Sequence, residues 1–339
     1  MSTHTIVTGL GGYLPPRRVT NQEILQRVCD TTGYRIPVGL IERGTGIQER
    51  RFAAPDEQPT DLACQAAKAA LVDAGRATQD VDTVIFASAS RDIAEPACAN
   101  LLAHKLDISA VPAFDVSNAC NSLLTAVDLA EALIQSGKAN TVLVAAGEKC
   151  SYLIDYRITS KADLKHLLSG LTLGDAGGAL ILEAGENTDY GIHYSRARSF
   201  GEHWDLSVVM GGGTCCGRDI EASYFHCQGD ALFALAVDKI APELEAMLKT
   251  TGWQPRDIAL VAAHQASRNV IERLARRVGI DPGRCALSMQ SSGNTAAASI
   301  PLALHQARAA GKVQAGDKVL LVGGATGFSV AVVGLVWGI

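Results

Sequence analysis

The sequence predicts an α/β fold built from two similar halves, because short apolar runs alternate with alanine-rich segments of helical length and this order recurs along the chain. Alternation of this kind is typical of buried, largely parallel strands that are covered by helices. The 339 residues, 47% hydrophobic and 19% charged, can bury a core of that size and show no compositional sign of disorder.

The expected strands are short apolar runs, and the expected helices are longer runs rich in alanine. Strands are expected over residues 81–87, 141–146, 258–263 and 318–322, and helices over residues 59–74, 121–136, 269–278 and 296–310. Residues 319–339 carry no charge and match the length of a membrane-spanning helix. The five glycines of that segment favour two buried strands joined by a turn, so we expect no membrane anchor.

The order of motifs in the first half reappears in the second half. VDTVIFASASR, NACNSLLTAVDLAEALIQSGK and NTVLVAAGE are matched later by DIALVAAHQASR, SGNTAAASIPLALHQARAAGK and DKVLLVGGA. Cys120 lies 17 residues before Gly137, and Asn294 lies 17 residues before Gly311. The repeat therefore predicts that Cys120 and Asn294 occupy equivalent turns, each just ahead of a helix.

Cys120 is the candidate nucleophile. In DVSNACNS it follows a short strand and precedes a long helix, whose N-terminus offers free N–H groups and a partial positive charge. A thiol in that position is expected to have a lowered pKa, and the same groups would stabilise an oxyanion. The alternative is a buried cysteine with a packing role, which describes most free thiols.

His264 and Asn294 are the candidate partners of Cys120. His264 follows the apolar run LVAA, and functional groups of α/β proteins gather at the carboxyl ends of strands. A neutral imidazole there can take the thiol proton or donate a hydrogen bond to an oxyanion. Asn294 could equally cap a helix or form a turn, but its equivalence to Cys120 favours a role in the site.

Composition argues against several classes of function. The net charge of −5 and the lack of a basic run disfavour nucleic-acid binding. The nine cysteines include no Cys-x-x-Cys pair and no ordered Cys/His set, so we expect no metal site. The N-terminus lacks a signal-peptide pattern, and we expect reduced thiols and a cytoplasmic location.

These motifs resemble the thiolase superfamily, and specifically its ketoacyl-acyl carrier protein synthase III branch. VTNQEIL, RGTGIQERRFA, DVSNAC, LGDAGGALIL, HQAS and GNTAAASIP follow that family's order over nearly the whole chain. The resemblance implies a thiolase fold with five layers, α/β/α/β/α, made of a half with the nucleophile (1–185) and a half with the histidine and asparagine (186–339). It also implies a homodimer, and we expect the seam at residues 141–146 and in the residues before Cys120.

The same resemblance implies roles for individual residues. Cys120 would be the acylated nucleophile, and His264 and Asn294 would hold the donor thioester carbonyl and assist decarboxylation. The backbone N–H groups of Cys120 and of a residue near Gly327 would form the oxyanion hole. The substrates would be acyl groups carried by coenzyme A or by an acyl carrier protein, and no further cofactor is expected.

Some features depart from the housekeeping synthases of that branch. RDIAEPA contains Glu95, which resembles the extra carboxylate of a sub-branch that includes olefin-pathway condensing enzymes and α-pyrone synthases. Glu95 is either a base that removes a proton from an acyl thioester or a solvated charge in a loop. Arg43 is a loose match to the nucleotide-binding arginine, because one residue is inserted before TGI, and Arg268 in HQASR is a second candidate for substrate binding.

The sequence therefore predicts an acyltransferase that forms a carbon–carbon bond by Claisen condensation of an acyl group on Cys120 with a second acyl or malonyl thioester. One alternative is transfer of the acyl group to an oxygen or nitrogen acceptor. Another is the joining of two long acyl chains without decarboxylation, with Glu95 as the base. A catalytically silent partner subunit is disfavoured, because Cys120, His264 and Asn294 are all present.

Overall fold

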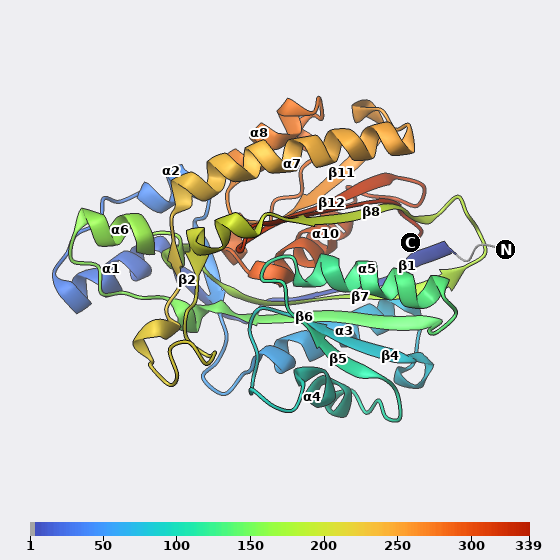
Figure 1. Cartoon of the computed structure of the whole chain (residues 1–339), viewed down its shortest axis with the longest axis horizontal. Helices are drawn as coiled ribbons and strands as arrows, with labels where there is room; N and C mark the ends of the chain where they lie inside the picture. Colours follow the sequence, from blue (N-terminus) through green and yellow to red (C-terminus); the bar gives the residue numbers. More distant parts are fainter. Residues whose placement is uncertain (1–3) are drawn as a thin grey trace.

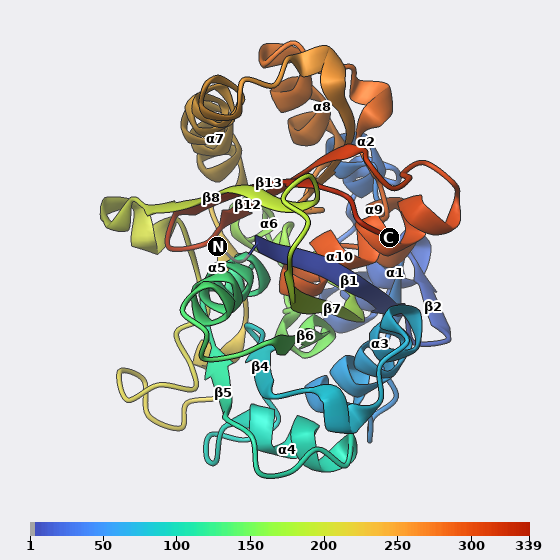
Figure 2. The same ribbon diagram turned by 90° about the vertical axis from the view of Figure 1, so that its right-hand side faces the viewer.

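The computed structural model describes residues 4–339, which form two stacked sheets with helices between and outside them (Figure 1). The first sheet has the strand order β1-β7-β6-β4-β5, and the second has the order β11-β12-β13-β8. Helices α5 and α10 pack between the sheets, α3 and α4 cover the outer face of the first, and α7 and α8 cover the outer face of the second (Figure 2). The predicted five layers are confirmed.

The strands of the first sheet all come from the first 185 residues, and those of the second sheet all come from later residues. The first sheet comprises β1 (His4–Tyr13), β4 (Thr83–Ala87), β5 (Ala113–Val116), β6 (Thr141–Lys149) and β7 (Asp175–Gly185). The second comprises β8 (Gly191–Ser199), β11 (Ile258–Ala263), β12 (Lys318–Ala325) and β13 (Ser329–Val336). The covering and central helices are α3 (Pro59–Ala74), α4 (Cys98–Lys105), α5 (Ser122–Gln135), α7 (Gly229–Thr251), α8 (Arg268–Arg277) and α10 (Ser299–Ala309).

Smaller elements surround the two sheets. The short strands are β2 (Arg17–Thr20), β3 (Glu49–Phe52), β9 (Ser207–Val208) and β10 (His226–Cys227), and the short helices are α1 (Asn21–Thr32), α2 (Leu40–Thr45), α6 (Lys161–Leu167) and α9 (Met289–Ser292). The 3₁₀ turns are η1 (Thr78–Asp80), η2 (Cys150–Leu153), η3 (Gly170–Thr172), η4 (Gly201–Leu206), η5 (Glu221–Ser223), η6 (Pro255–Asp257), η7 (Pro282–Arg284) and η8 (Ala296–Ala298).

The two sheets share one pairing pattern, which supports the internal repeat. In the first sheet β4 runs parallel to β6, β6 is antiparallel to β7, and β7 is antiparallel to β1. In the second sheet β11 runs parallel to β12, β12 is antiparallel to β13, and β13 is antiparallel to β8. Strand β5 runs parallel to β4 in the first sheet. Its counterpart in the second sheet is a single parallel bridge between Val261 of β11 and Cys285. Helices α5 and α10 then occupy equivalent positions, as the sequence repeat predicts.

Close packing of α3 on the first sheet explains its alanine content and the glycines below it. Pro59 lies at the first helical position, where a missing N–H costs nothing, and Gly75 ends the helix in the left-handed conformation with φ 63°. A Cβ on Gly147 would lie 1.8 Å from the carbonyl oxygen of Pro59, and one on Gly177 would lie 2.0 Å from that of Leu62. Gly147 and, within the GDAGGA segment, Gly177 therefore allow α3 to pack closely against the first sheet.

Most of the expected elements agree with the structure to within a few residues. The helix at 59–74 and the strand at 258–263 match, β6 and β12 run three residues beyond their expected ends, and the helix expected at 296–310 divides into η8 and α10. The uncharged segment at 319–339 forms β12 and β13 with a turn between them, as expected. Within the described residues, none of the helices combines the length and the apolar character needed to cross a membrane.

Part of the expected dimer seam is wrong. Residues 141–146 belong to β6, which lies between β7 and β4 and is buried on both faces. An apolar run of this kind reflects a central strand of a covered sheet, so it carries no information about a partner. The residues before Cys120 fit the expectation better, because they include β5, which forms an open edge of the first sheet.

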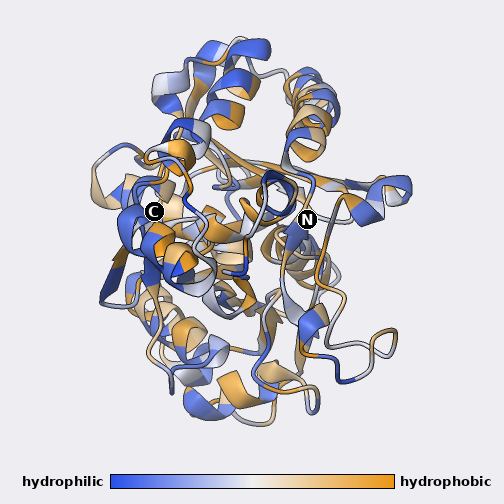
Figure 3. Ribbon diagram, turned by 90° about the vertical axis from the view of Figure 1, so that its left-hand side faces the viewer, coloured by the Kyte–Doolittle hydropathy of each residue, from blue (hydrophilic) through white to orange (hydrophobic). Residues whose placement is uncertain are grey.

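Hydrophilic residues gather mainly on the outer helices and loops of the molecule (Figure 3).

Candidate active site

The turn that carries Cys120 is held in a strained conformation between β5 and α5. Ala119 has φ 48°, in the left-handed region that residues with a Cβ rarely adopt. The hydroxyl of Ser122 accepts a hydrogen bond from the N–H of Asn118 at 2.8 Å and donates to the carbonyl of Ala119 at 2.7 Å. These bonds close the turn and set Cys120 immediately before the helix.

Asn121 anchors the same turn to the second half of the chain. Its side chain is fully buried, and its amide NH₂ donates to the hydroxyl of Ser329 at 2.9 Å and to the carbonyl of Ser329 at 3.1 Å. A Cβ on Gly323 would lie 1.9 Å from the Asn121 amide oxygen, so only glycine allows this approach. The position of Cys120 therefore depends on strands β12 and β13.

Asn294 lies in the turn that corresponds to the Cys120 turn. Gly293 has φ 71° and precedes Asn294, as Ala119 precedes Cys120. The backbone of Asn294 donates to the carbonyl of Thr172 at 2.9 Å and accepts from the N–H of Gly174 at 2.9 Å. Its side-chain oxygen accepts from the N–H of Ala296 at 3.1 Å, which fixes the amide group in one direction.

His264 follows the last residue of β11, and its N–H donates to the carbonyl of Val322 at 2.8 Å. Nδ1 of the ring lies 2.9 Å from the hydroxyl of Ser299, which leaves the other ring nitrogen for the pocket. Burial lowers the pKa of His264 to about 4, and a contact with the carbonyl of Ala296 opposes that shift only in part. The imidazole is therefore neutral at pH 7.

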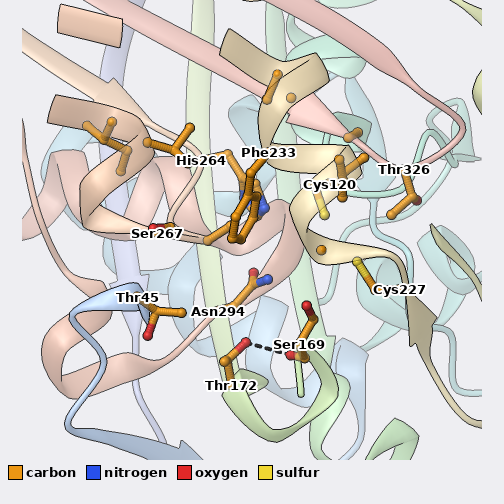
Figure 4. A pocket seen from close by; sticks show the side chains of 18 of the residues that line it. Thr45, Cys120, Ser169, Thr172, Cys227, Phe233, His264, Ser267, Asn294 and Thr326 are labelled. Atoms are coloured by element: carbon orange, nitrogen blue, oxygen red, sulfur yellow. Dashed lines mark hydrogen bonds between the residues drawn. The ribbon is translucent and has the colours of Figure 1, made fainter. Parts of the chain in front are cut away.

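Cys120, His264 and Asn294 line one pocket of about 320 Å³, and Figure 4 shows their side chains around the same cavity. Helix α7 contributes more lining residues than any other element, α8 and β12 add further ones, and the wall is largely apolar. Five residues with hydroxyl groups interrupt the apolar lining, namely Thr45, Ser169, Thr172, Ser267 and Thr326. An apolar pocket with a few hydrogen-bonding groups suits an extended acyl or amide-containing chain.

The expected activation of the Cys120 thiol by the helix start is wrong. Burial raises the pKa of this thiol to about 12, and the nearby carboxylate of Glu148 adds to the rise. The backbone N–H groups of Cys120 and Thr326 favour the thiolate but do not outweigh burial. The thiol is therefore protonated in the free protein, so it must lose its proton before it can act as a nucleophile.

The loop between β12 and β13 supplies backbone groups beside the thiol. Gly327 has φ 92°, which makes the tight turn possible, but it does not line the pocket. Its neighbour Thr326 does line the pocket, and the backbone N–H of Thr326 hydrogen-bonds to the Cys120 sulfur and favours the thiolate. The backbone donor that was expected near Gly327 is thus best placed at Thr326.

The remaining residues that the sequence singled out lie outside the pocket. Glu95 is exposed in the loop after β4 and does not line the pocket of its own chain. Arg43 is exposed, with Nη1 3.2 Å from the carbonyl of Val38, and adjoins the pocket residues Gly44 and Thr45. Arg268 is exposed and pairs with Glu272 at 2.7 Å. Both arginines are therefore at the mouth of the pocket and not within it.

Glu148 is a buried group beside the site that sequence reasoning missed. Its side chain is fully buried and its charge affects the Cys120 thiol. The signal in the sequence is a single carboxylate at the end of the apolar run VLVAAG. The equivalent position in the second half holds Ala325, so the repeat gave no reason to consider Glu148 as a site residue.

A strained cysteine turn, a neutral histidine and an oriented asparagine on one pocket of a five-layer α/β/α/β/α fold define a condensing enzyme of the thiolase type. Two family models match the chain, 3-oxoacyl-[acyl-carrier-protein (ACP)] synthase III over residues 114–201 and the C-terminal model of the same family over residues 248–337. The chain belongs to the beta-ketoacyl-[acyl-carrier-protein] synthase III family, whose members are acyltransferases that carry out Claisen condensation through a cysteine acyl-enzyme.

Similar proteins support this assignment over the full length. The beta-ketoacyl-[acyl-carrier-protein] synthase III of Rhodospirillum centenum is 37% identical over 332 residues, which cover 97% of this chain and 98% of the relative. The synthase III of Aquifex aeolicus is 32% identical, with a TM-score of 0.86 and coverage of 98% and 100%. OleA of Xanthomonas campestris, solved with lauric acid and lauroyl-CoA, is 24% identical and shares the fold, with a TM-score of 0.89 and coverage of 99% and 100%.

Proposed function

We propose that Cys120 carries the acyl group of the first half-reaction. Its sulfur attacks the thioester carbonyl of the donor, the carrier thiol leaves, and the thiol proton of Cys120 passes to the leaving sulfur. The N–H groups of Cys120 and Thr326 would stabilise the tetrahedral oxyanion, because both already lie beside the sulfur. Neutral His264 can relay the proton, since burial keeps its ring uncharged.

In the second half-reaction we assign His264 and Asn294 to the incoming thioester. Loss of carbon dioxide from a malonyl thioester gives an enolate, and the two side chains would donate hydrogen bonds to its oxygen. The carbanion then attacks the acyl carbonyl, a carbon–carbon bond forms, and Cys120 leaves as a thiolate that is protonated again. The observation that carries this proposal is the meeting of all three side chains, from both halves of the chain, on one pocket.

The experiment follows the two half-reactions separately. Intact-protein mass spectrometry after incubation with a panel of acyl thioesters would identify the acyl group that loads onto Cys120. Malonyl thioester is then added, and the product is analysed for a new carbon–carbon bond. Loading followed by release of free acid or of an ester or amide, without a β-ketoacyl product, would favour transfer to an oxygen or nitrogen acceptor instead.

The mouth of the pocket favours substrates that carry negative charge. Helix α8 begins beside the pocket residue Ser267 and exposes four arginines in a chain with a net charge of −5, namely Arg268, Arg273, Arg276 and Arg277. Either the phosphates of coenzyme A or an acidic carrier protein would be attracted to this face. We propose an acyl-coenzyme A or acyl-carrier-protein substrate with no further cofactor, and loading rates with matched acyl groups on each carrier would separate the two.

We also propose a homodimer that forms along the β5 edge. Strand β5 pairs only with β4, so its outer edge presents unpaired backbone groups, which natural proteins usually cover. Pairing with the same strand of a second copy would satisfy these groups on both chains. Sedimentation velocity at micromolar concentration is expected to give the mass of a dimer, and a stable monomer would contradict this seam.

Glu95 gives a second candidate reaction, the joining of two acyl chains without decarboxylation. The loop that carries it is tied down on both sides: Asp92 accepts from the N–H of Thr60 at 2.9 Å, and Asp115 of β5 accepts from the N–H of Cys98 at 2.9 Å. Glu95 is therefore held exposed near the open edge and away from its own pocket. In a dimer across β5, it would face the second copy.

The variant Glu95→Gln separates the two reactions. Decarboxylation generates the carbanion without a base, whereas an unactivated acyl thioester needs one. If Glu95 is that base, the variant should lose condensation with unactivated acyl thioesters and keep condensation with malonyl thioester. Retention of both reactions would make Glu95 a solvated loop residue and the chain a decarboxylating synthase.

A further inference from the structure

A buried carboxylate next to the candidate active site is not used by the chemistry proposed above. Glu148 lies near the end of β6, its side chain is 0% exposed, and its pKa is raised to about 7 by burial. Among residues 4–339 no basic side chain forms an ion pair with it. An unpaired buried carboxylate is destabilising unless hydrogen bonds replace the lost water. Its hydrogen bonds therefore indicate what it does.

Every neighbour of the Glu148 carboxylate is a donor. Oε1 accepts from the N–H of Ala89 at 2.8 Å and from the N–H of Ala297 at 3.3 Å. Oε2 accepts from the N–H of Ser90 at 2.9 Å and from its hydroxyl at 2.6 Å, and the thiol of Cys150 lies 3.8 Å away. Two acceptor oxygens are needed to satisfy this set, and among side chains only a carboxylate supplies them in this geometry.

The donors come from two parts of the chain that are far apart in the sequence. Ala89 and Ser90 follow β4 in the first half, whereas Ala297 belongs to η8 in the second half. Ala297 lies three residues after Asn294, and between them Ala296 has φ 42°, in the left-handed region. Oε1 therefore joins the two halves at the point where the Asn294 turn enters η8.

The N–H of Ala296 also fixes the Asn294 amide, at 3.1 Å from its oxygen. Any movement of η8 away from Glu148 would shift this donor and turn the amide group. A displacement of about 1 Å in a group that orients a reactant can lower a rate about 100-fold. The Glu148 carboxylate is thus one residue removed from the contact that aims Asn294 into the pocket.

We propose that Glu148 is a positioning residue for the condensation half-reaction, because its carboxylate holds η8 against the loop after β4 and so fixes the direction of Asn294. This inference rests on the role proposed for Asn294. The loading half-reaction does not depend on Asn294 and should be largely spared when Glu148 is changed.

The test uses the full-length protein and two variants of different shape and charge. In Glu148→Gln the amide NH₂ meets at least one backbone N–H in either orientation, so the junction between the loop after β4 and η8 should loosen. Glu148→Asp keeps two acceptor oxygens on a shorter side chain. We expect loading within about threefold of the parent in both variants, condensation about 100-fold slower in Glu148→Gln, and an intermediate rate in Glu148→Asp.

A matched control is Glu183→Gln. Glu183 is a buried carboxylate on β7, paired with Arg76 at 2.7 Å and opposite Thr141 at the other end of β6. It should lose stability without a change in the ratio of condensation to loading. If Glu148→Gln does not fold by circular dichroism, the same ratio is measured in Glu148→Asp and should still fall by about tenfold.

A second measurement tests whether the Glu148 carboxylate acts on the Cys120 thiol in solution, as its position in the structure implies. At about pH 9, where the Glu148 carboxyl is ionised, removing its charge should make Cys120 react at least about threefold faster with iodoacetamide, because that charge raises the pKa of the thiol. The control variant should not change this rate. A parent enzyme that neither loads nor condenses would refute the proposed function. A parent that does both, with an unchanged condensation-to-loading ratio in Glu148→Gln and Glu148→Asp, would refute this inference alone.

Discussion

Replacement of His264 should remove a specific part of the acid sensitivity of the fold. Burial lowers the pKa of His264 to about 4 in the folded protein, below its ordinary value of 6.5. The stability that this group contributes is therefore fully present above pH 6.5 and is lost as the pH falls toward 4. The ring must give up its proton on folding, and that cost appears only at acidic pH.

The size of the effect follows from the two pKa values. Between pH 7 and pH 5 the unfolded imidazole takes up most of a proton, whereas the folded one stays largely neutral. The corresponding loss in the free energy of unfolding is about 2 kcal/mol. In the variant His264→Asn this part of the loss should be absent. The pKa values of His193 and His305 are also lowered, but these residues contribute equally to both proteins and cancel.

The assay is urea unfolding of the parent and of His264→Asn at pH 7 and pH 5, at one fixed protein concentration. The variant is expected to be about 2 kcal/mol less sensitive to the pH change than the parent. A ring-proton titration of the parent by NMR should show one histidine signal that moves only near pH 4 and is missing from the variant. Equal pH sensitivity of the two proteins would refute the argument that burial keeps His264 neutral.

Three further changes test the site. Cys120→Ala should abolish acyl loading while the free energy of unfolding changes by no more than about 1 kcal/mol, measured by intact mass and urea unfolding, because little beyond the thiol is removed. Asn294→Ala should slow condensation far more than loading, and equal losses in separate half-reaction assays would show that its role is misassigned. Gly323→Ala should destabilise the protein by about 1–3 kcal/mol and slow loading, because the new Cβ clashes with the amide oxygen of Asn121; an unchanged melting temperature would contradict this.

The two-half architecture could be predicted because it follows from patterns within the sequence. Helix α3 was expected with the bounds that it has, and in the structure Pro59 and Gly75 mark its ends. The equivalence of Cys120 and Asn294 was visible as equal spacing to a later glycine, and the structure adds a left-handed residue before each of them. Local signals of this kind are independent of how distant segments pack.

The properties that depend on tertiary packing were not predictable from local patterns. The pKa of the Cys120 thiol is set by how much protein surrounds the sulfur, and burial outweighs the helix start. The apolar strand at residues 141–146 was expected at the dimer seam, but its place between two other strands was not visible in one sequence. Glu148 gave only a weak signal, because its partner Ala297 lies 149 residues away.

The most direct test of the central claim is a two-step experiment on the parent protein followed by intact-protein mass spectrometry. After an acyl thioester is added, the mass should increase by one acyl group, and peptide mapping should place that group on Cys120. When malonyl thioester follows, the adduct should disappear as a β-ketoacyl thioester appears in equal amount. An acyl group found on another residue, or an adduct that persists or yields no carbon–carbon bond, would contradict the account.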